Sequence, residues 1–346
     1  MLLLENSAEH KYNFADQDTK KKEKNLKKIE ESFKIPSPEF KVTFADSFFE
    51  CIDHVKEPNI KADDLYETLI SKDMIQKYGP YFCDSFDKKN TEIPPVNFLA
   101  RHQFKATTRR RFVDWMIEVF YKLDSDENTF FAAVRILDKF IWKCGSIISE
   151  KSLYAAGVTS MYIASKTYDF YPIRMKDLIS KISHNSLNEK VIKKLEGMIL
   201  TDINFDVMSP GPSEFIQFLL YDLYMNNKGL ISKYRLRKII DIVENCAIWI
   251  AKMCYHFEKY SSITPNNMAI ACLFIGYEMA KDNKDLNKNE KKFFVEWLEY
   301  LFNKIGKDEK GKKYIDILYQ DIYQTFVKFK KMGYNNLKKY HYLFFE

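Results

Sequence analysis

A run of small and apolar residues over 150–168 is the feature that most constrains how this chain can fold. A helix drawn through this run is apolar on every side and carries small residues along its length, namely Ala155, Ala156, Gly157, Ser160, Ala164 and Ser165. Such a helix has to be buried, and its small residues let neighbouring helices approach closely. The run therefore predicts the central helix of an all-α unit.

Amphipathic helices are predicted on both sides of this central helix. Upstream, apolar residues from Phe112 to Leu123 lie on one stripe, and Thr107 or Thr108 is the predicted N-cap. A second stripe runs from Phe130 to Ile141. Downstream, a short helix over 175–182 and a longer one over 188–203 complete a unit of five helices.

The same plan repeats after Pro210-Gly-Pro212. Helices are predicted over 213–224, 234–256, 292–302 and 315–330, together with a small and apolar one that opens at Thr264-Pro265 and contains Gly276. Only ten Gly and ten Pro are present, which argues against an all-β protein built on tight turns. The periodicity predicts an all-α protein with two similar halves behind an N-terminal extension.

These patterns divide the chain into predicted segments. We expect an irregular tail over 1–60, a leading helix and linker over 61–106, a first unit over 107–208, a second unit over 213–335 and a C-terminal tail over 336–346. The first segment contains a lysine-rich charge run and the helix-breaking sequence Ile35-Pro-Ser-Pro38.

Composition narrows the class of protein. A net charge of +6 over 346 residues permits an acidic partner without requiring nucleic acid. The six cysteines are too scattered for a disulfide framework or a zinc site, which favours a reducing compartment. No apolar run is long enough to span a bilayer, and Met1-Leu-Leu-Leu4 is too short for a signal peptide. A soluble intracellular protein without a membrane partner is expected.

Three motifs carry a family resemblance. They are Arg109-Arg-Arg-Phe-Val-Asp-Trp-Met-Ile-Glu-Val119, Ala164-Ser-Lys-Thr-Tyr-Asp-Phe-Tyr-Pro172, and the stretch from Leu195 to Asp206. In this order and at these separations they resemble the cyclin box of the mitotic cyclins. The resemblance covers roughly residues 95–335 and is dense over 107–207. It implies an all-α fold of two tandem five-helix cyclin-box units, no catalytic residues, and a partner kinase that the protein holds in one conformation.

The resemblance assigns two ion pairs. Arg109 and Asp138 match a pair that is buried inside the cyclin box, where it joins the first two helices and each charge needs its partner. Lys166 and Glu196 match the two residues that cyclins present to the kinase. In the family the lysine donates to backbone carbonyls beside the kinase's regulatory helix, and the glutamate orients the lysine. Without the family context, Lys166 and Glu196 would be an ordinary solvated pair of little value.

The resemblance assigns three more residues to the same contact face, namely the apolar Leu200, Phe205 and Val207. The alternative is that they are ordinary core residues. The sequence departs from the family beside the contact lysine. Thr167 stands where mitotic cyclins usually carry Phe, and Tyr168 stands where an acid is usual. The kinase contact is therefore expected to differ in detail.

The substrate-docking patch of the family is degenerate here. Trp115, Glu118 and Leu153 are kept, but Arg111 replaces an apolar wall and Tyr154 replaces a polar one. An Arg-x-Leu peptide would meet a like charge and lose its leucine pocket. Recruitment of such substrate or inhibitor proteins is expected to be weak.

The favoured interpretation is a non-enzymatic cyclin subunit that forms a heterodimer with a cyclin-dependent serine/threonine kinase and activates it. A role in cell-cycle control and a nuclear or cytoplasmic location follow from the resemblance. No cofactor or metal is implied, and neither a phosphate-binding loop nor a Ser/Cys–His constellation indicates an enzyme.

Two alternatives stay open. One is a nucleic-acid module like transcription factor TFIIB, because Lys105 and the arginines at 109–111 form a basic cluster. The absence of a zinc ribbon and the mild net charge count against it. The other is a cyclin-like scaffold that has lost kinase activation, which the departures at Thr167 and Tyr168 would explain.

Overall fold

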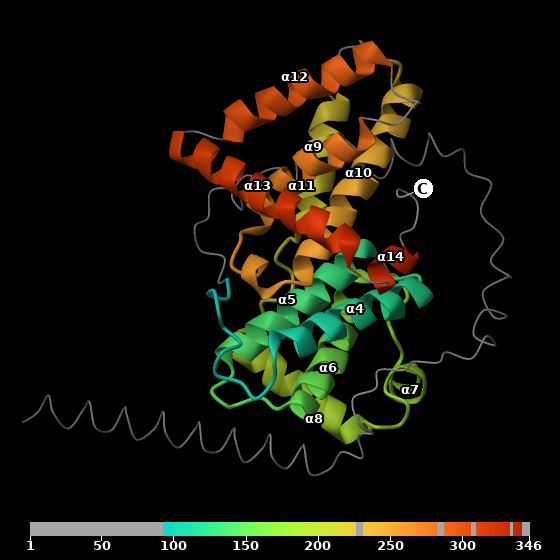
Figure 1. Ribbon diagram of the computed structural model, residues 1–346. Coiled ribbons are helices and arrows are strands. Elements are labelled where there is room, and N and C mark those ends of the chain that lie inside the picture. The colour runs from blue at the N-terminus through green and yellow to red at the C-terminus, as the bar shows by residue number, and fades with distance from the viewer. Residues whose placement is uncertain (1–92, 226–230, 282–286, 306–308, 333–334, 341–346) are drawn as a thin grey trace, which may run out of the picture. The chain divides into compact units, whose positions relative to one another are not determined.

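The computed structural model describes residues 93–225, 231–281, 287–305, 309–332 and 335–340, and contacts join these ranges into one compact unit (Figure 1). The expected N-terminal tail and leading helix lie outside the described residues. Of the expected linker, only the end, from residue 93 to 106, is described. Within the described ranges the protein is built of helices and contains one isolated β-bridge, between Gln103 and Ser149. The all-α prediction is confirmed.

Helices of the first half follow the predicted order closely. They are α4 (Ala106–Lys122), α5 (Glu127–Lys143), α6 (Glu150–Tyr168), the single turn α7 (Met175–Asp177) continued by a π-helical turn over Leu178–Ile182, and α8 (Glu189–Asp202). The central helix α6 packs against α5, α8 and α4.

The second half has the same number of main helices. They are α9 (Pro212–Met225), α10 (Lys233–Tyr255), α11 (Pro265–Ala280), α12 (Lys288–Ile305) and α13 (Glu309–Lys331), with a 3₁₀ turn over Glu258–Tyr260. Helix α11 packs against α10, α9 and α13, so it is the central helix here. Its first turn starts with Pro265, as predicted.

Glycine permits a close helix contact in both central helices. A Cβ atom added to Gly157 would lie 2.1 Å from Cε1 of Phe112 on α4. A Cβ added to Gly276 would lie 2.8 Å from the backbone nitrogen of Ala247 on α10. Both distances are far below van der Waals contact, so these positions require glycine for packing.

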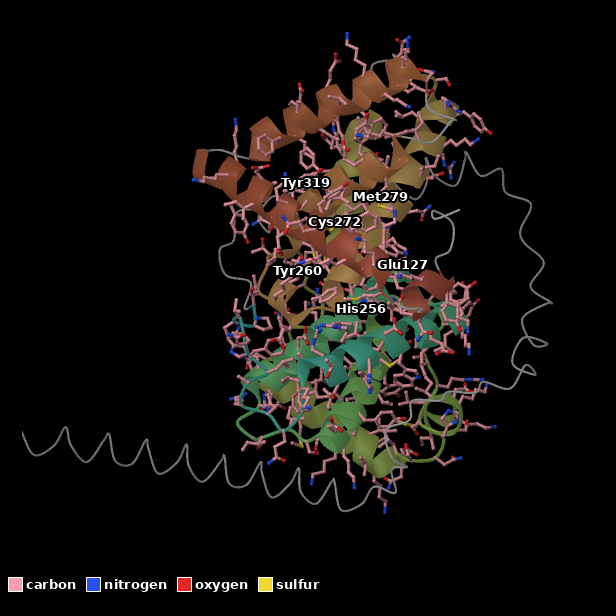
Figure 2. All side chains as sticks on the ribbon, in the orientation of Figure 1. Glu127, His256, Tyr260, Cys272, Met279 and Tyr319 are labelled. Atoms are coloured by element: carbon pink, nitrogen blue, oxygen red, sulfur yellow. The ribbon has the colours of Figure 1, made fainter. Side chains whose placement is uncertain are left out.

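Buried side chains fill the second half, where Figure 2 labels Tyr260 and Cys272. Tyr260 is 1 % exposed, and its hydroxyl donates to Oγ1 of Thr325 at 2.8 Å. Burial raises the pKa of Tyr260 well above its usual range. Cys254 and Cys272 are buried free thiols. Among the described helices, none combines the length and the hydropathy that a bilayer crossing requires.

The predicted N-cap of the first helix is wrong. Helix α4 begins at Ala106, so Lys105 occupies the capping position, and its side chain makes no capping hydrogen bond. Thr108 lies inside the first turn, and its hydroxyl donates instead to Oε1 of Glu150 at 2.9 Å. This bond ties the start of α4 to the start of α6, which local sequence could not indicate.

Part of the expected C-terminal tail is a packed helix. Residues Asn336–Tyr340 form α14, which lies against α4 (Figure 1). Leu337 is fully buried, and the ring centroids of Tyr340 and Tyr121 lie 4.5 Å apart. A five-residue helix is too short to show a periodic pattern in the sequence.

Candidate functional site

Lys166 and Glu196 meet between the end of α6 and the middle of α8. The Lys166 ammonium forms an ion pair with Oε1 of Glu196, and it also lies 4.3 Å from the ring centroid of Tyr162. The Lys166 side chain is 39 % exposed and that of Glu196 is 18 % exposed. An ammonium has three donors, so a lysine held in this way can still donate to acceptors of a partner.

The loop that leaves α6 is pinned by Asp169. Its carboxylate accepts hydrogen bonds from the backbone N–H of Asp126 at 3.0 Å, from the Thr129 hydroxyl at 2.5 Å and from the Ser165 hydroxyl at 2.6 Å. The Ser165 oxygen in turn accepts from the backbone N–H of Ile173 at 2.8 Å. Both ends of the loop are thus held by helices α5 and α6.

Two aromatic residues stand at the tip of this pinned loop. Phe170 is 89 % exposed and Tyr171 is 85 % exposed, and their rings meet edge to face at 4.8 Å. Large exposed aromatic side chains on a rigid loop are typical of protein-interaction sites. Sequence reasoning used Tyr171 only as a family marker, because periodicity does not report the exposure of loop residues.

The apolar residues predicted for the contact face follow α8. Phe205 is 68 % exposed, whereas Leu200 and Val207 are half-buried. Leu200 lies one helical turn after Glu196, so it is on the same side of α8. The described surface near the ion pair therefore carries one strongly exposed ring from the predicted set.

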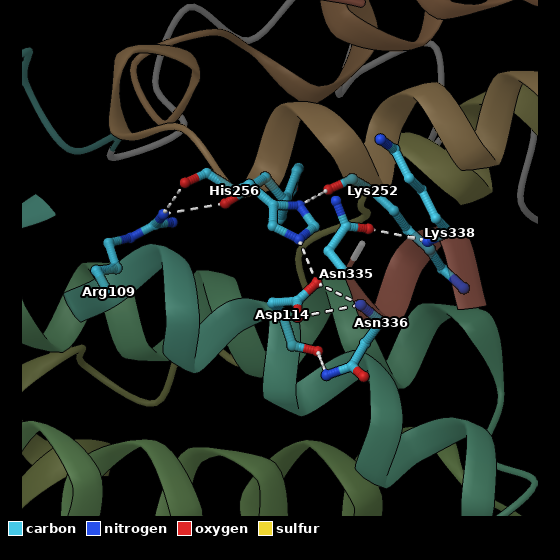
Figure 3. Close-up of polar contacts among 8 residues, drawn as sticks. Arg109, Asp114, Lys252, His256, Asn335, Asn336 and Lys338 are labelled. Atoms are coloured by element: carbon cyan, nitrogen blue, oxygen red, sulfur yellow. Dashed lines mark hydrogen bonds and ion pairs between the residues drawn. The ribbon is translucent and has the colours of Figure 1, made fainter. Parts of the chain in front are cut away.

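Arg109 and Asp138 form a buried, two-pronged ion pair. Nε of Arg109 donates to Oδ1 of Asp138 at 2.8 Å, and Nη2 donates to Oδ2 at 2.6 Å. Arg109 is 1 % exposed. Its Nη1 also donates to the carbonyls of Tyr255 at 3.0 Å and His256 at 3.5 Å, at the end of α10 (Figure 3). The pair therefore joins three helices, and the resemblance had implied only two.

Asp114 makes a second set of contacts between helices, which sequence reasoning missed. Its carboxylate accepts from the Asn336 backbone N–H at 3.1 Å and lies 3.2 Å from Nε2 of His256 (Figure 3). The Asn336 side chain donates to the Asp114 carbonyl at 3.1 Å. One carboxylate on α4 thus holds the end of α10 and the start of α14. Its partners lie so far along the chain that no local pattern links them.

The degenerate docking patch is closed by the chain's own residues. Trp115 is 3 % exposed, and the ring of Tyr154 lies 5.9 Å from it. Glu118 accepts from Lys122 at 2.9 Å and from the Tyr340 hydroxyl at 3.2 Å.

Exposure differs between the other two patch residues. Leu153 is only 1 % exposed, whereas Arg111 faces solvent. The leucine that would line a peptide pocket is therefore inside the core.

The basic cluster is not a continuous charged surface. Arg109 is buried in its ion pair, and the Arg110 guanidinium lies 4.6 Å from the ring centroid of Phe257. Burial, followed by the charge of Arg109, lowers the pKa of Arg110. Lys105 and Arg111 are the members of the cluster that face solvent. Within the described ranges, no group of His, Cys, Asp or Glu is placed to hold a metal ion.

Comparisons with known proteins match the same region. Residues 82–208 match the family described as cyclin, N-terminal domain. This stretch of the chain is similar to a cyclin N-terminal domain. A putative cyclin-F3-1 of Oryza sativa subsp. japonica is 26% identical over 198 residues, which cover 56% of this chain and 48% of the relative. This chain is also 25% identical to the G2/mitotic-specific cyclin-B2 of Homo sapiens over 167 residues, which cover 48% of this chain and 35% of the relative.

The matched part of the chain thus spans about half, or less, of the length of these curated relatives. Among solved structures, a viral cyclin from herpesvirus saimiri superposes with a TM-score of 0.49 and 15% identity. That match covers 65% of this chain and 88% of the viral cyclin.

Proposed function

We propose that this protein is a non-enzymatic regulatory subunit that binds and activates a cyclin-dependent serine/threonine kinase. The observation that carries the proposal is the half-exposed ion pair between Lys166 and Glu196 at the end of α6. The match of residues 82–208 to the cyclin N-terminal domain supports it, and by the sequence resemblance this pair corresponds to the residues that cyclins present to a kinase. The proposed role belongs to cell-cycle control, in the nucleus or the cytoplasm.

The chemistry of the pair suits a contact with backbone carbonyls. Glu196 and the Tyr162 ring hold the Lys166 ammonium in place, so little side-chain entropy is lost when a partner binds. The remaining ammonium protons can donate to carbonyl oxygens at the end of a partner helix, where positive charge is favourable.

Activation would be a population shift in the kinase. A subunit that binds only the conformation with the kinase's own Lys–Glu ion pair formed stabilises that conformation at the expense of the inactive one. No residue of the subunit needs to touch the reacting phosphate.

The departures beside Lys166 point to a divergent partner. The Thr167 hydroxyl donates to the Ile163 carbonyl at 3.0 Å, so this side chain folds back on its own helix. A bulky aromatic side chain at this position would instead extend the contact surface. We therefore expect the kinase to carry a compensating side chain opposite Thr167.

The scaffold alternative rests on the same departures and predicts binding without activation. The nucleic-acid alternative is disfavoured because Arg109 and Arg110 are engaged within the protein. Retention on DNA at physiological salt would favour it.

Affinity purification of the full chain, followed by identification of co-purified kinases, tests the proposal. The identified kinase is then produced separately and assayed for substrate phosphorylation with and without this chain. A rise in activity of tenfold or more is expected. Binding without a rise supports the scaffold alternative, and the absence of any kinase contradicts the proposal.

A further inference from the structure

The turn that follows α8 holds two consecutive residues in the left-handed backbone region. Asn204 has φ 54° and Phe205 has φ 57°. Asn tolerates this region, but a bulky residue such as Phe is strained there. The Phe205 backbone N–H donates to the Leu200 carbonyl at 2.8 Å, which ends the helix at this point. Something outside the turn must compensate for the strained backbone.

Helix α5 supplies that compensation through two basic residues. Lys139 has a side chain that is 3 % exposed, and its ammonium pairs with the Asp206 carboxylate. Nη2 of Arg135 donates to the Val207 carbonyl at 3.0 Å. The Ser209 hydroxyl also donates to Asp206. The turn is thereby fixed to α5 by a charge pair and a backbone contact.

The titration of Asp206 is consistent with this geometry. Burial by itself would raise the pKa of the Asp206 carboxyl. Hydrogen bonds from Lys139 and Ser209, with the charges of Lys139 and Arg135, keep that pKa below its usual value. The charged form of Asp206, which the turn needs, is therefore the stable one near neutral pH.

The ring that this turn carries points outward. Phe205 is 68 % exposed, so burial of the ring does not offset the strained backbone. Strained residues that the surrounding structure over-determines occur at functional sites, where the strain keeps a group in place for a partner.

We propose that Lys139 and Arg135 are positioning residues that hold the 204–208 turn so that Phe205 is a preformed apolar contact for the kinase. This inference rests on the proposed function. Lys139 itself is buried and does not reach the partner. It acts through Asp206 by removing the ordering cost that a free loop would add to binding.

The main test uses Lys139→Met in the full chain, with Lys139→Arg as the conservative variant. Lys292→Met is the matched control, because Lys292 on α12 pairs with Glu296 at the surface, where its side chain is 77 % exposed. Two quantities are measured: hydrogen exchange of the 204–208 amides in the isolated protein, and affinity for a panel of purified cyclin-dependent kinases on a biosensor. Lys139→Met should speed exchange at least tenfold and weaken affinity at least tenfold. Lys139→Arg should stay within threefold of wild type, and Lys292→Met should change neither quantity.

Two further variants separate positioning from general stability. Arg135→Gln removes the bond to the Val207 carbonyl and the Arg135 charge that acts on Asp206, and it serves if Lys139→Met does not fold. Phe205→Gly relieves the left-handed backbone, so its Tm should equal or exceed that of wild type while its kinase affinity falls at least tenfold. A residue with a purely structural role would not give that combination.

The possible outcomes are distinguishable. Faster exchange with weaker affinity supports the inference. If wild type binds a kinase but Lys139→Met and Arg135→Gln bind it equally well, the inference is overturned and the proposed function stands. If exchange of the turn amides is unchanged in both variants, the anchoring itself is wrong. If wild type binds none of the kinases, the proposed function fails and the inference fails with it.

Discussion

At the scale of single residues, Lys166 and Arg109 each pair with a carboxylate across two helices, but their surroundings differ. The Lys166 side chain is 39 % exposed, whereas that of Arg109 is 1 % exposed. Water solvates the first pair, so it adds little to stability, while the second depends on its partner to offset desolvation. The same substitution should therefore affect binding at one site and folding at the other.

Lys166→Ala should abolish stable kinase binding without changing the fold. Loss of a charged donor from a desolvated interface costs on the order of 2–5 kcal/mol of binding. The solvated pair is worth under about 1 kcal/mol to the isolated protein, so its Tm should barely move. Titration calorimetry and thermal melts of Lys166→Ala and of the surface control Lys292→Ala give the comparison. An unchanged affinity for the kinase would show that Lys166 is not the contact.

Arg109→Ala should have the opposite effect. It leaves the Asp138 carboxylate buried at 4 % exposure without its main partner and also removes a donor to the Tyr255 carbonyl. A loss of about 3–5 kcal/mol in the free energy of unfolding is expected from urea titration. Arg111→Ala, at an exposed position on the same helix, is the control and should change stability by less than about 0.5 kcal/mol.

Acid should weaken the protein through His102. Its Nδ1 accepts from the Ile148 backbone N–H at 3.1 Å, so its other nitrogen carries the proton and donates to the Ile141 carbonyl at 3.0 Å. Burial, followed by the charge of Arg101, lowers the pKa of His102 from 6.5 to about 4. Between pH 4 and 6.5, His102 is protonated in the unfolded chain but neutral in the folded protein. The contribution of neutral His102 to the free energy of unfolding is therefore fully present above pH 6.5 and is lost as pH falls toward 4.

The loss is at most about 3.5 kcal/mol, because the pKa of His102 falls from 6.5 to about 4 and each pKa unit is worth about 1.4 kcal/mol. Urea titrations at several pH values compare wild type with His102→Gln. A steeper loss between pH 6.5 and 4 is expected in wild type. Identical slopes would assign the acid sensitivity to other groups.

At the scale of elements, the short helix α14 depends on α4. Asp114 accepts the Asn336 backbone N–H and lies beside His256, while Leu337 is fully buried below them. Helix α14 has five residues, which is too short to be stable by itself in water. Its order is therefore imposed by these contacts.

Asp114→Ala should release α14. It removes the acceptor for the Asn336 N–H, and the buried donors left behind cost about 1–3 kcal/mol. Limited proteolysis should cut the variant after the end of α13 at protease levels that leave wild type intact. Asp316→Ala, at an exposed position on α13, is the control and should behave as wild type. Equal protection of the two variants would show that Asp114 does not hold the helix.

At the scale of the whole molecule, internal contacts take up most of the residues that match the family's substrate-docking patch. Trp115 and Leu153 are buried in the core, and Tyr340 from α14 donates to Glu118. The residues that would receive a docking peptide are therefore already part of the fold. Partner selection is expected to rest on the kinase contact and not on substrate docking.

Arg-x-Leu peptides should bind weakly or not at all. The exposed Arg111 repels the peptide arginine, and the buried Leu153 offers it no pocket. Fluorescence anisotropy with a labelled peptide should show no binding below about 100 μM, which corresponds to roughly 5–6 kcal/mol. Arg111→Ile combined with Tyr154→Gln should recover measurable affinity. Submicromolar binding by wild type would contradict the closed patch.

The sequence by itself determined the all-α fold, the order of the helices and both central helices. These features depend on local periodicity and on small residues such as Gly157 and Gly276, which short stretches of chain display. The family motifs likewise located Lys166 and Glu196, which form an ion pair in the structure. Their contact with a kinase stays a prediction.

Only the tertiary structure decided how the helices are joined. Asp114 meets Asn336 at a sequence separation of 222 residues and His256 at 142, and Arg109 reaches Tyr255 across 146. The strained outward placement of Phe205 likewise depends on Lys139, which is 67 residues from its partner Asp206. A hydrogen bond between distant residues forms because the packing of the helices brings them together. The sequence around either residue therefore does not predict its partner.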